Sequence, residues 1–269
     1  MTSGLVPITR DRHGQKTFRR FSSYGFAGTQ TVAPLVAAEL AKVAVSFPIA
    51  FLRENNQTVL VAVLGIEPGI NLFVAPDGRW AGPYVPAAFR SYPFVLAETE
   101  DNRQVLCVNE ASGLVVDDPS GEAFFAEGNT PSEAVRGILD FLMKIHENRL
   151  LTVRACEALA RHDLLEPWTL IAPGESGPRQ VTGLWRISED RLGQLGDEAF
   201  LELRRTGALA LAYAQLMSMG HLPLLERLAS LRAEMAKRSA APLPASLDSV
   251  FGTPGASEEL TIDWSKFKS

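Results

Sequence analysis

Two stretches of the chain repeat the same order of signals: a short apolar helix, a proline, and two β-rich runs. Residues 46–51 read SFPIAF, and residues 91–96 read SYPFVL. In each copy the proline ends the helix, because it cannot continue the helical hydrogen-bond ladder. The two β-rich runs that follow lie on either side of a polar turn, which is typical of a hairpin. The repeat therefore predicts an antiparallel sheet built from helix–proline–hairpin units.

Proline positions predict where the helix of each copy begins and ends. Pro34 and Pro86 are expected to open the helices of the first two copies. A third copy is weaker: a helix is expected to end at Pro167, and the runs WTLIA and RQVTGLWRI follow on either side of a glycine-rich turn. An alternative stays open, in which the copies share only common turn chemistry.

A long amphipathic helix is expected after residue 129. Thr130 is the expected N-cap, Pro131 the first helical residue, and Glu133 completes a capping box. Apolar residues then keep to one side for about 30 residues, with a kink expected near Asn148. More helices follow Trp185, where glycines and prolines mark their ends.

These elements predict an α+β fold, with a mainly antiparallel sheet packed against the long helix and a C-terminal helical region. We expect an extended N-terminal segment over residues 1–30 and a single α+β domain over 31–238. A flexible linker and tail are expected over 239–269. The tail carries the run ELTIDWSKF, which docks either on its own domain or on a partner.

Composition bears on compartment and partners. The chain has 269 residues and a net charge of −5, which argues against nucleic acid as a partner. Its most basic stretch, from Arg10 to Arg20, is read as a solvated tail. Cys107 and Cys156 lie among apolar neighbours and are expected to be buried free thiols, which suits a reducing compartment.

No transmembrane segment and no signal peptide are expected. The most apolar window, residues 35–52, is interrupted by Glu39, Lys42 and Pro48. Residues 1–9 lack a basic start and a continuous apolar run. We therefore expect a cytoplasmic protein, with export to the cell surface without a signal peptide as the alternative.

The usual catalytic signatures are missing from the sequence, and we expect no catalytic residue, metal or cofactor. There is no glycine-rich phosphate loop and no nucleophile elbow. His146-Glu147 begins like a zinc-protease helix, but Leu150 stands where the second histidine would be. The two cysteines and four histidines lack the spacing of a zinc site.

Two groups of polar residues are candidate ligand-binding sites. His146, Arg149 and Glu157 fall on the apolar side of the long helix, and ionisable groups on a buried face are costly unless paired. They predict either a polar pocket between helix and sheet, or satisfied groups at the rim of the core. The second group is the stretch that holds Trp80, Tyr84 and Arg90, which either stacks on sugars or bases or forms core-edge cation–π contacts.

Several long blocks of this sequence closely resemble the SapC family of bacterial proteins. They include VAPLVAAELAKVAVSFPIAFL, NLFVAPDGRWAGPYVPAAFRSYPF, GEAFFAEGNTPSEAVRGILDFL and GLWRISEDRLGQL. The resemblance runs from about residue 31 to residue 235. It implies an association with bacterial surface layers, or with outer-membrane TonB-dependent receptors and flavin-dependent tryptophan halogenases. It carries over no catalytic residue, and the peptide-uptake permease that shares the name is a different protein.

Three functions follow as hypotheses. The first is a non-enzymatic binding or accessory protein of the SapC family, associated with the cell surface or with uptake and halogenase systems. The second is an enzyme or small-molecule-binding protein that uses the pocket around His146, Arg149 and Glu157. The third is a self-assembling surface protein. The first and third predict a protein partner or self-association, and the second predicts a small-molecule ligand.

Overall fold

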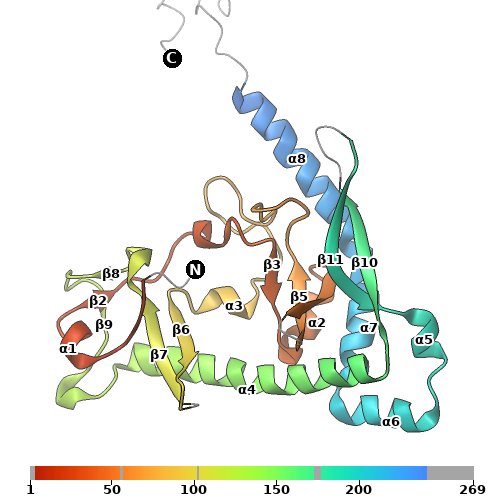
Figure 1. Cartoon of the computed structure of the whole chain (residues 1–269). Helices are drawn as coiled ribbons and strands as arrows, with labels where there is room; N and C mark the ends of the chain where they lie inside the picture. Colours follow the sequence, from red (N-terminus) through yellow and green to blue (C-terminus); the bar gives the residue numbers. More distant parts are fainter. Residues whose placement is uncertain (1–3, 55–56, 102, 173–176, 241–269) are drawn as a thin grey trace, which may run out of the picture. The chain divides into compact units, whose positions relative to one another are not determined.

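The computed structural model describes residues 4–54, 57–101, 103–172 and 177–240. The expected tail ELTIDWSKF lies outside these residues. Contacts divide the chain into two compact units, residues 1–230 and 231–269. The first unit mixes helices with antiparallel sheets (Figure 1), so the expected α+β class is confirmed.

The elements have the following bounds. The strands are β1 (Leu5–Pro7), β2 (Thr17–Phe18), β3 (Val32–Pro34), β4 (Ile49–Glu54), β5 (Gln57–Val63), β6 (Phe94–Glu98), β7 (Gln104–Asn109), β8 (Val115–Val116), β9 (Glu122–Ala123), β10 (Leu165–Ala172) and β11 (Arg179–Ile187). The helices are α1 (Arg10–His13), α2 (Leu40–Val43), α3 (Ala87–Arg90), α4 (Glu133–Arg161), α5 (Glu189–Gly193), α6 (Asp197–Thr206), α7 (Ala208–Ser218) and α8 (Leu222–Ala240). A 3₁₀ turn, η2 (Ala37–Glu39), leads into α2.

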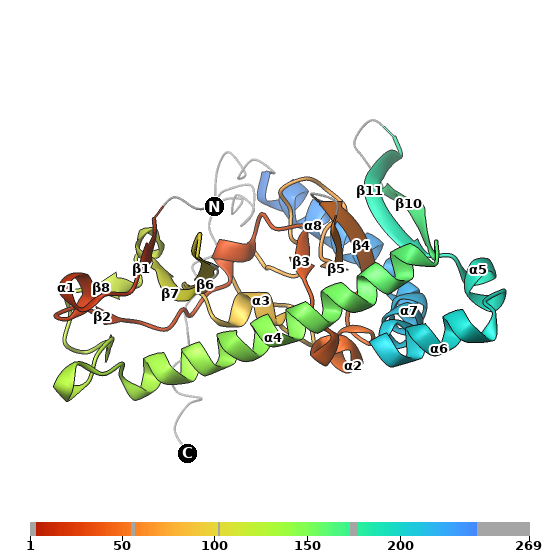
Figure 2. The same cartoon turned by 60° about the horizontal axis from the view of Figure 1, so that its bottom comes forward.

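The larger sheet has the strand order β10-β11-β4-β5-β3 and forms the main core. Phe47, Phe51 and Leu60 are among its fully buried side chains. Helix α4 packs against β5, and α7 packs against β4 and β11. Figure 2 shows α4 running past β6 and β7 in its first half and past β3 and β5 in its second.

The two secure copies of the repeat form three-stranded units with the same register. In the first copy, Val61 of β5 pairs with Ala50 of β4 and with Pro34 of β3. In the second, Cys107 of β7 pairs with Val95 of β6 and with Pro7 of β1. Both prolines lie on edge strands, where the missing N–H costs no ladder bond. The hairpins were expected; the third strand of each unit comes from N-terminal residues that carry no periodic signal.

Two expectations about prolines are wrong. Pro34 lies in β3 and does not open a helix; the apolar residues after it form only η2 and the four-residue α2. Helix α4 ends at Arg161, well before Pro167, and Pro167 lies within β10. The third copy is therefore a hairpin without the preceding short helix and proline. Strand β10 tolerates the proline because it is an edge strand.

The start of α4 also differs from the expected start. Ser132 is the N-cap, and its Oγ accepts a hydrogen bond from the N–H of Val135 at 3.2 Å. A serine at this position satisfies one of the unpaired N–H groups of the first turn. The helix then continues through Asn148 as one element, and the expected kink is not there.

The N-terminal residues 4–30, expected to be extended, pair in two small sheets. Strand β2 lies between β8 and β9, and Phe18 is buried against Phe94 and Phe124 in a second core. Three arginines of this segment are exposed but paired. Arg12 contacts Glu110 at 2.6 Å, Arg20 contacts Glu122 at 2.6 Å, and Arg19 pairs with Asp118.

The burial of His13 is expected to make the docking of this segment dependent on pH. Its ring is fully buried beside Phe124, and its Nδ1 accepts a hydrogen bond from the N–H of Thr9. Burial lowers the pKa of His13 below its usual value of 6.5. The negative charge of Glu110 acts in the opposite direction and raises this pKa, since its Oε1 lies 3.2 Å from Nε2 of His13. Arg12 and Lys16 also disfavour the cation.

Acidification should therefore destabilise this segment. Because the folded pKa is depressed, the unfolded chain binds more protons below about pH 6.5, and stability falls as the pH falls. We expect the urea midpoint to drop between pH 7.5 and pH 5.5, and to drop less in His13→Leu. Hydrogen bonding to Arg12 holds the pKa of Glu110 at about 2, so Glu110 stays charged throughout this range. Equal pH slopes for the two proteins would contradict this assignment.

Both cysteines, Cys107 and Cys156, are buried free thiols, as expected. Among the described residues, one helical stretch, Ala208–Met235, is long and apolar enough to span a membrane by length and composition alone. A third of its apolar 18-residue window is buried within the protein. The buried polar residues Gln215 and Ser218 of α7 bond to the backbone of β4 and β11.

Candidate functional site

The most deeply buried carboxylate that the structure describes belongs to Glu39, at the end of η2. Its side chain is 5% exposed. One oxygen accepts hydrogen bonds from the N–H of Ala87 at 2.6 Å and from the hydroxyl of Tyr84 at 2.9 Å. The other accepts from the N–H of Val36 at 3.2 Å. Glu39 therefore joins η2 to the first turn of α3.

Helix α4 fixes η2 in place. The Oγ1 of Thr152 accepts a hydrogen bond from the N–H of Ala37 at 2.8 Å. The Oδ1 of Asn148 accepts one from the N–H of Ala38 at 3.2 Å. Two side chains one helical turn apart thus satisfy the first N–H groups of η2, which would otherwise lack partners.

Trp80, Tyr84 and Arg90 meet around this carboxylate. The indole Nε1 of Trp80 donates to the carbonyl of Tyr84 at 2.7 Å. The guanidinium of Arg90 lies 4.9 Å from the centre of the Tyr84 ring and donates to the Tyr84 hydroxyl. It also lies 3.6 Å from Glu39. The structure thus brings these three candidate residues together, and Glu39 is the member that the sequence did not single out.

The electrostatics of this cluster hold Tyr84 in its neutral form. Burial, followed by the charge and hydrogen bond of Glu39, raises the pKa of Tyr84 to about 12. The phenol therefore keeps its proton at neutral pH and donates it to Glu39. Its role is to hold the carboxylate and to receive a hydrogen bond from Arg90.

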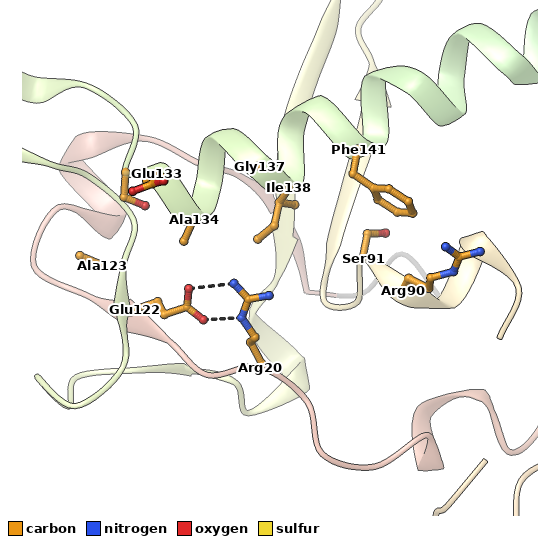
Figure 3. A pocket seen from close by; sticks show the side chains of 11 residues that line it. Arg20, Arg90, Ser91, Glu122, Ala123, Glu133, Ala134, Gly137, Ile138 and Phe141 are labelled. Atoms are coloured by element: carbon orange, nitrogen blue, oxygen red, sulfur yellow. Dashed lines mark hydrogen bonds and ion pairs between the residues drawn. The ribbon is translucent and has the colours of Figure 1, made fainter. Parts of the chain in front are cut away.

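Arg90 forms one wall of an open hollow of about 820 Å³, which we call the α3–α4 groove (Figure 3). Its apolar floor comes from the first half of α4, and its other walls come from α3 and from the region of β2 and β9. The lining residues are Arg20, Arg90, Ser91, Glu122, Ala123, Ser132, Glu133, Ala134, Gly137, Ile138 and Phe141.

The charges of the groove are divided between its two ends. Arg20 is paired with Glu122 through two hydrogen bonds, of 2.6 and 3.0 Å. Glu133 and Arg90 lie toward opposite ends in Figure 3. Within the described parts of the chain, the Nη1 of Arg90 has no hydrogen-bond partner, and Glu133 has no ion-pair partner. The groove can therefore bury apolar groups on its floor and receive an anion at Arg90.

The other candidate group is only partly brought together. Half-buried His146 and exposed Arg149 line a second hollow of about 420 Å³ between α4 and β6. Glu157 is exposed and does not line it. The second half of α4 turns a different face to the sheet, formed by Thr152, Ala155, Cys156 and Leu159. The stripe centred on Leu142 therefore does not continue to Glu157.

The residues that sequence reasoning missed had weak local signals. Glu39 reads as an interruption in an apolar run, although its place three residues after Val36 suits a carboxylate that bonds back to the N-cap backbone. Glu122 and Phe141 occur in stretches with no catalytic or binding motif. Across the described ranges, no three His, Cys, Asp or Glu side chains are grouped as metal ligands.

The comparisons with known proteins agree with the resemblance seen in the sequence. The family model described as SapC matches residues 8–225. No curated protein matches the chain. No solved structure matches it either.

Proposed function

This chain belongs to the SapC family, and we propose that it is a non-enzymatic binding protein that holds a partner polypeptide in the α3–α4 groove. The observation that carries the proposal is the position of Arg90 at the wall of this groove, above an apolar floor. The occupant is a segment that places apolar side chains on Ile138 and Phe141 and an acidic group against Arg90. An accessory role in uptake or halogenase systems is part of the same proposal.

The support for binding comes from the way in which Arg90 is held. Its Nε donates to the carbonyl of Val85 at 3.0 Å, and its Nη2 donates to Tyr84. Its guanidinium lies within cation–π distance of two rings, 4.9 Å from the centre of Tyr84 and 5.9 Å from the centre of Phe141. A guanidinium fixed in this way loses little side-chain entropy when it binds a carboxylate.

An enzyme centred on His146, Arg149 and Glu157 has less support. Only two of the three residues share a hollow. The buried pair of Glu39 and Tyr84 links two backbone segments, because Glu39 also accepts hydrogen bonds from the N–H groups of Val36 and Ala87. The pKa of Tyr84, about 12, lies far from the range in which a side chain exchanges protons readily at neutral pH.

A blocking substitution at Gly137 tests the groove directly. A Cβ added at Gly137 meets no atom within 4 Å, so a large side chain there enters the groove without displacing the core. We expect Gly137→Trp to lose the partner that the wild-type chain captures from its host. Gly137→Ala is the matched control: it should keep the partner and gain about 0.5–1 kcal/mol of stability, because alanine is the better helix former.

The captured partner is then purified, and its affinity is measured for the wild-type protein, Gly137→Trp and Gly137→Ala. A drop of at least about tenfold in affinity for Gly137→Trp alone, about 1.4 kcal/mol, supports the groove. Equal binding by the tryptophan and alanine variants would place the partner elsewhere. Turnover of a small molecule by the purified protein, without any partner, would refute a binding role.

A further inference from the structure

Strand β6 is an open edge of the β1-β7-β6 sheet. It has five residues, Phe94–Glu98, and the part of the chain that the structure describes pairs it with β7 alone. An open edge presents a row of unpaired N–H and C=O groups that another extended chain can use. The sequence of β6, FVLAE, contains no proline.

The hydrogen-bond pattern shows which groups of β6 face outward. At one end the N–H of Asn109 donates to the carbonyl of Pro93, and at the other the N–H of Thr99 donates to the carbonyl of Arg103. In an antiparallel pair, bonded and non-bonded positions alternate. Val95 and Ala97 therefore bond to β7, and the backbone groups of Leu96 and Glu98 point away from it. No hydrogen bond reaches those outward groups from the described residues.

A groove runs beside this free edge. It is the second hollow, of about 420 Å³, and we call it the β6–α4 groove. Leu96 and Glu98 line one side of it, and Leu142, Ile145, His146 and Arg149 of α4 line the other. A strand placed beside β6 would therefore have one face against α4. Leu142 and Ile145 offer that face an apolar contact.

The charges on the α4 side select for acidic residues. Within the described residues, neither Arg149 nor His146 has an ion-pair partner, and Arg149 is exposed. Among the residues that the structure describes, Glu98 is the only acidic side chain that lines the groove. An incoming strand with an acidic residue at the Arg149 position would gain a charge-assisted contact there.

We infer that β6 accepts an extended segment of a partner polypeptide as an added strand, with apolar residues over Leu142 and Ile145 and an acidic residue facing Arg149. This surface is separate from the floor and charged walls of the α3–α4 groove, and the inference does not depend on the function proposed for that groove. It adds a second contact surface, which recognises backbone as well as side chains.

A second copy of this chain fits the edge less well. Pairing β6 with its own copy would use five residues on each side. Stable dimers bury about 800 Å² per partner, which is far more than so short a ribbon provides. A single extended segment needs only the outward groups of Leu96 and Glu98 and the neighbouring face of α4.

A short synthetic peptide tests the inference. The probe is acetyl-Thr-Val-Thr-Val-Thr-Glu-amide, which places valines and the glutamate on one face and threonines on the other. NMR-detected amide exchange of the full chain is measured with and without the probe. The amides of Leu96 and Glu98 should exchange fast in the free protein and at least about tenfold more slowly with the probe, because the added strand bonds them. Val95 and Ala97, already bonded to β7, should change little.

Two methylated versions of the probe act as matched controls. One carries N-methyl groups on both valines, and the other carries them on the last two threonines. Because outward bonding alternates along a strand, only one of the two should retain binding. Equal binding of both versions would overturn the inference. Slow exchange of the Leu96 and Glu98 amides in the free protein would also overturn the inference. If that slow exchange appears only at concentrations where the chain dimerises, the edge pairs with a second copy instead.

Charge reversal separates this surface from the α3–α4 groove. Arg149→Glu should weaken the probe about tenfold and favour a version with lysine in place of glutamate. Arg154→Glu, on an exposed position of the same helix outside the groove, should leave binding unchanged. Gly137→Trp should also leave probe binding unchanged, so that failure here and failure of the proposed function give different results. Identical loss in Arg149→Glu and Arg154→Glu would contradict the placement of the acidic residue.

Discussion

Replacing Glu39 with alanine is expected to lower the free energy of unfolding by about 2–4 kcal/mol, because each donor that loses its acceptor inside the protein costs about 1–3 kcal/mol. The substitution leaves the N–H of Ala87 and the hydroxyl of Tyr84 without an acceptor. It also removes the carboxylate beside Arg90. Urea unfolding of the full chain measures the loss.

Two further variants show which contact matters. Glu39→Gln keeps an acceptor oxygen of the same shape and should lose clearly less. Tyr84→Phe removes only the hydroxyl and should cost about 1 kcal/mol, the net value of a typical hydrogen bond. A loss below 1 kcal/mol in Glu39→Ala would mean that water replaces the carboxylate and that the cluster does not organise α3.

Replacing Gln215 with leucine is expected to cost about 2–4 kcal/mol, although leucine is similar in size. The side chain is fully buried in α7. Its Oε1 accepts from the N–H of Ile187 in β11 at 3.0 Å, and its Nε2 donates to the carbonyl of Ile49 in β4 at 3.3 Å. Leucine would leave both backbone groups buried and unpaired, and each carries a desolvation cost of about 1–3 kcal/mol.

Thermal or urea unfolding, with Gln194→Leu as the control, measures this effect. Gln194 is exposed at the end of α5, and its replacement should change stability by no more than about 0.5 kcal/mol. If both leucine variants unfolded alike, α7 would not depend on the bridge that Gln215 makes between the two strands.

The parts of the fold that the sequence predicted correctly are those with local signals. The hairpins β4–β5 and β6–β7 follow from two β-rich runs around a polar turn, and both lie where expected. Strands β1 and β3 were missed because each has three residues, too few for a period. Their partners lie far along the chain, so only tertiary pairing defines them as strands.

The same distinction applies to the candidate site. Trp80, Tyr84 and Arg90 lie within a short stretch, so their composition alone marked them as a cluster. The carboxylate that organises them lies 45 residues from Tyr84, and no local pattern links the two. On α4, helical spacing places His146, Arg149 and Glu157 on the side of the helix that holds Leu142. Spacing does not show which turns of the helix the sheet covers. In the structure Arg149 lines a groove and Glu157 does not.

The pairing of β1 with β7 has a consequence for the order of folding. Leu5 pairs with Asn109, whereas β3, which follows β1 in the chain, pairs with the nearer β5. The longer loop between β1 and β7 adds about 1 kcal/mol of closure cost, and we expect these distant contacts to form after the nearer ones. During synthesis the first unit can close while the earliest residues still lack a partner, and the second unit is completed only after β7 has emerged. The two three-stranded units therefore share one pairing pattern, but we expect β3–β4–β5 to be completed before β1–β6–β7.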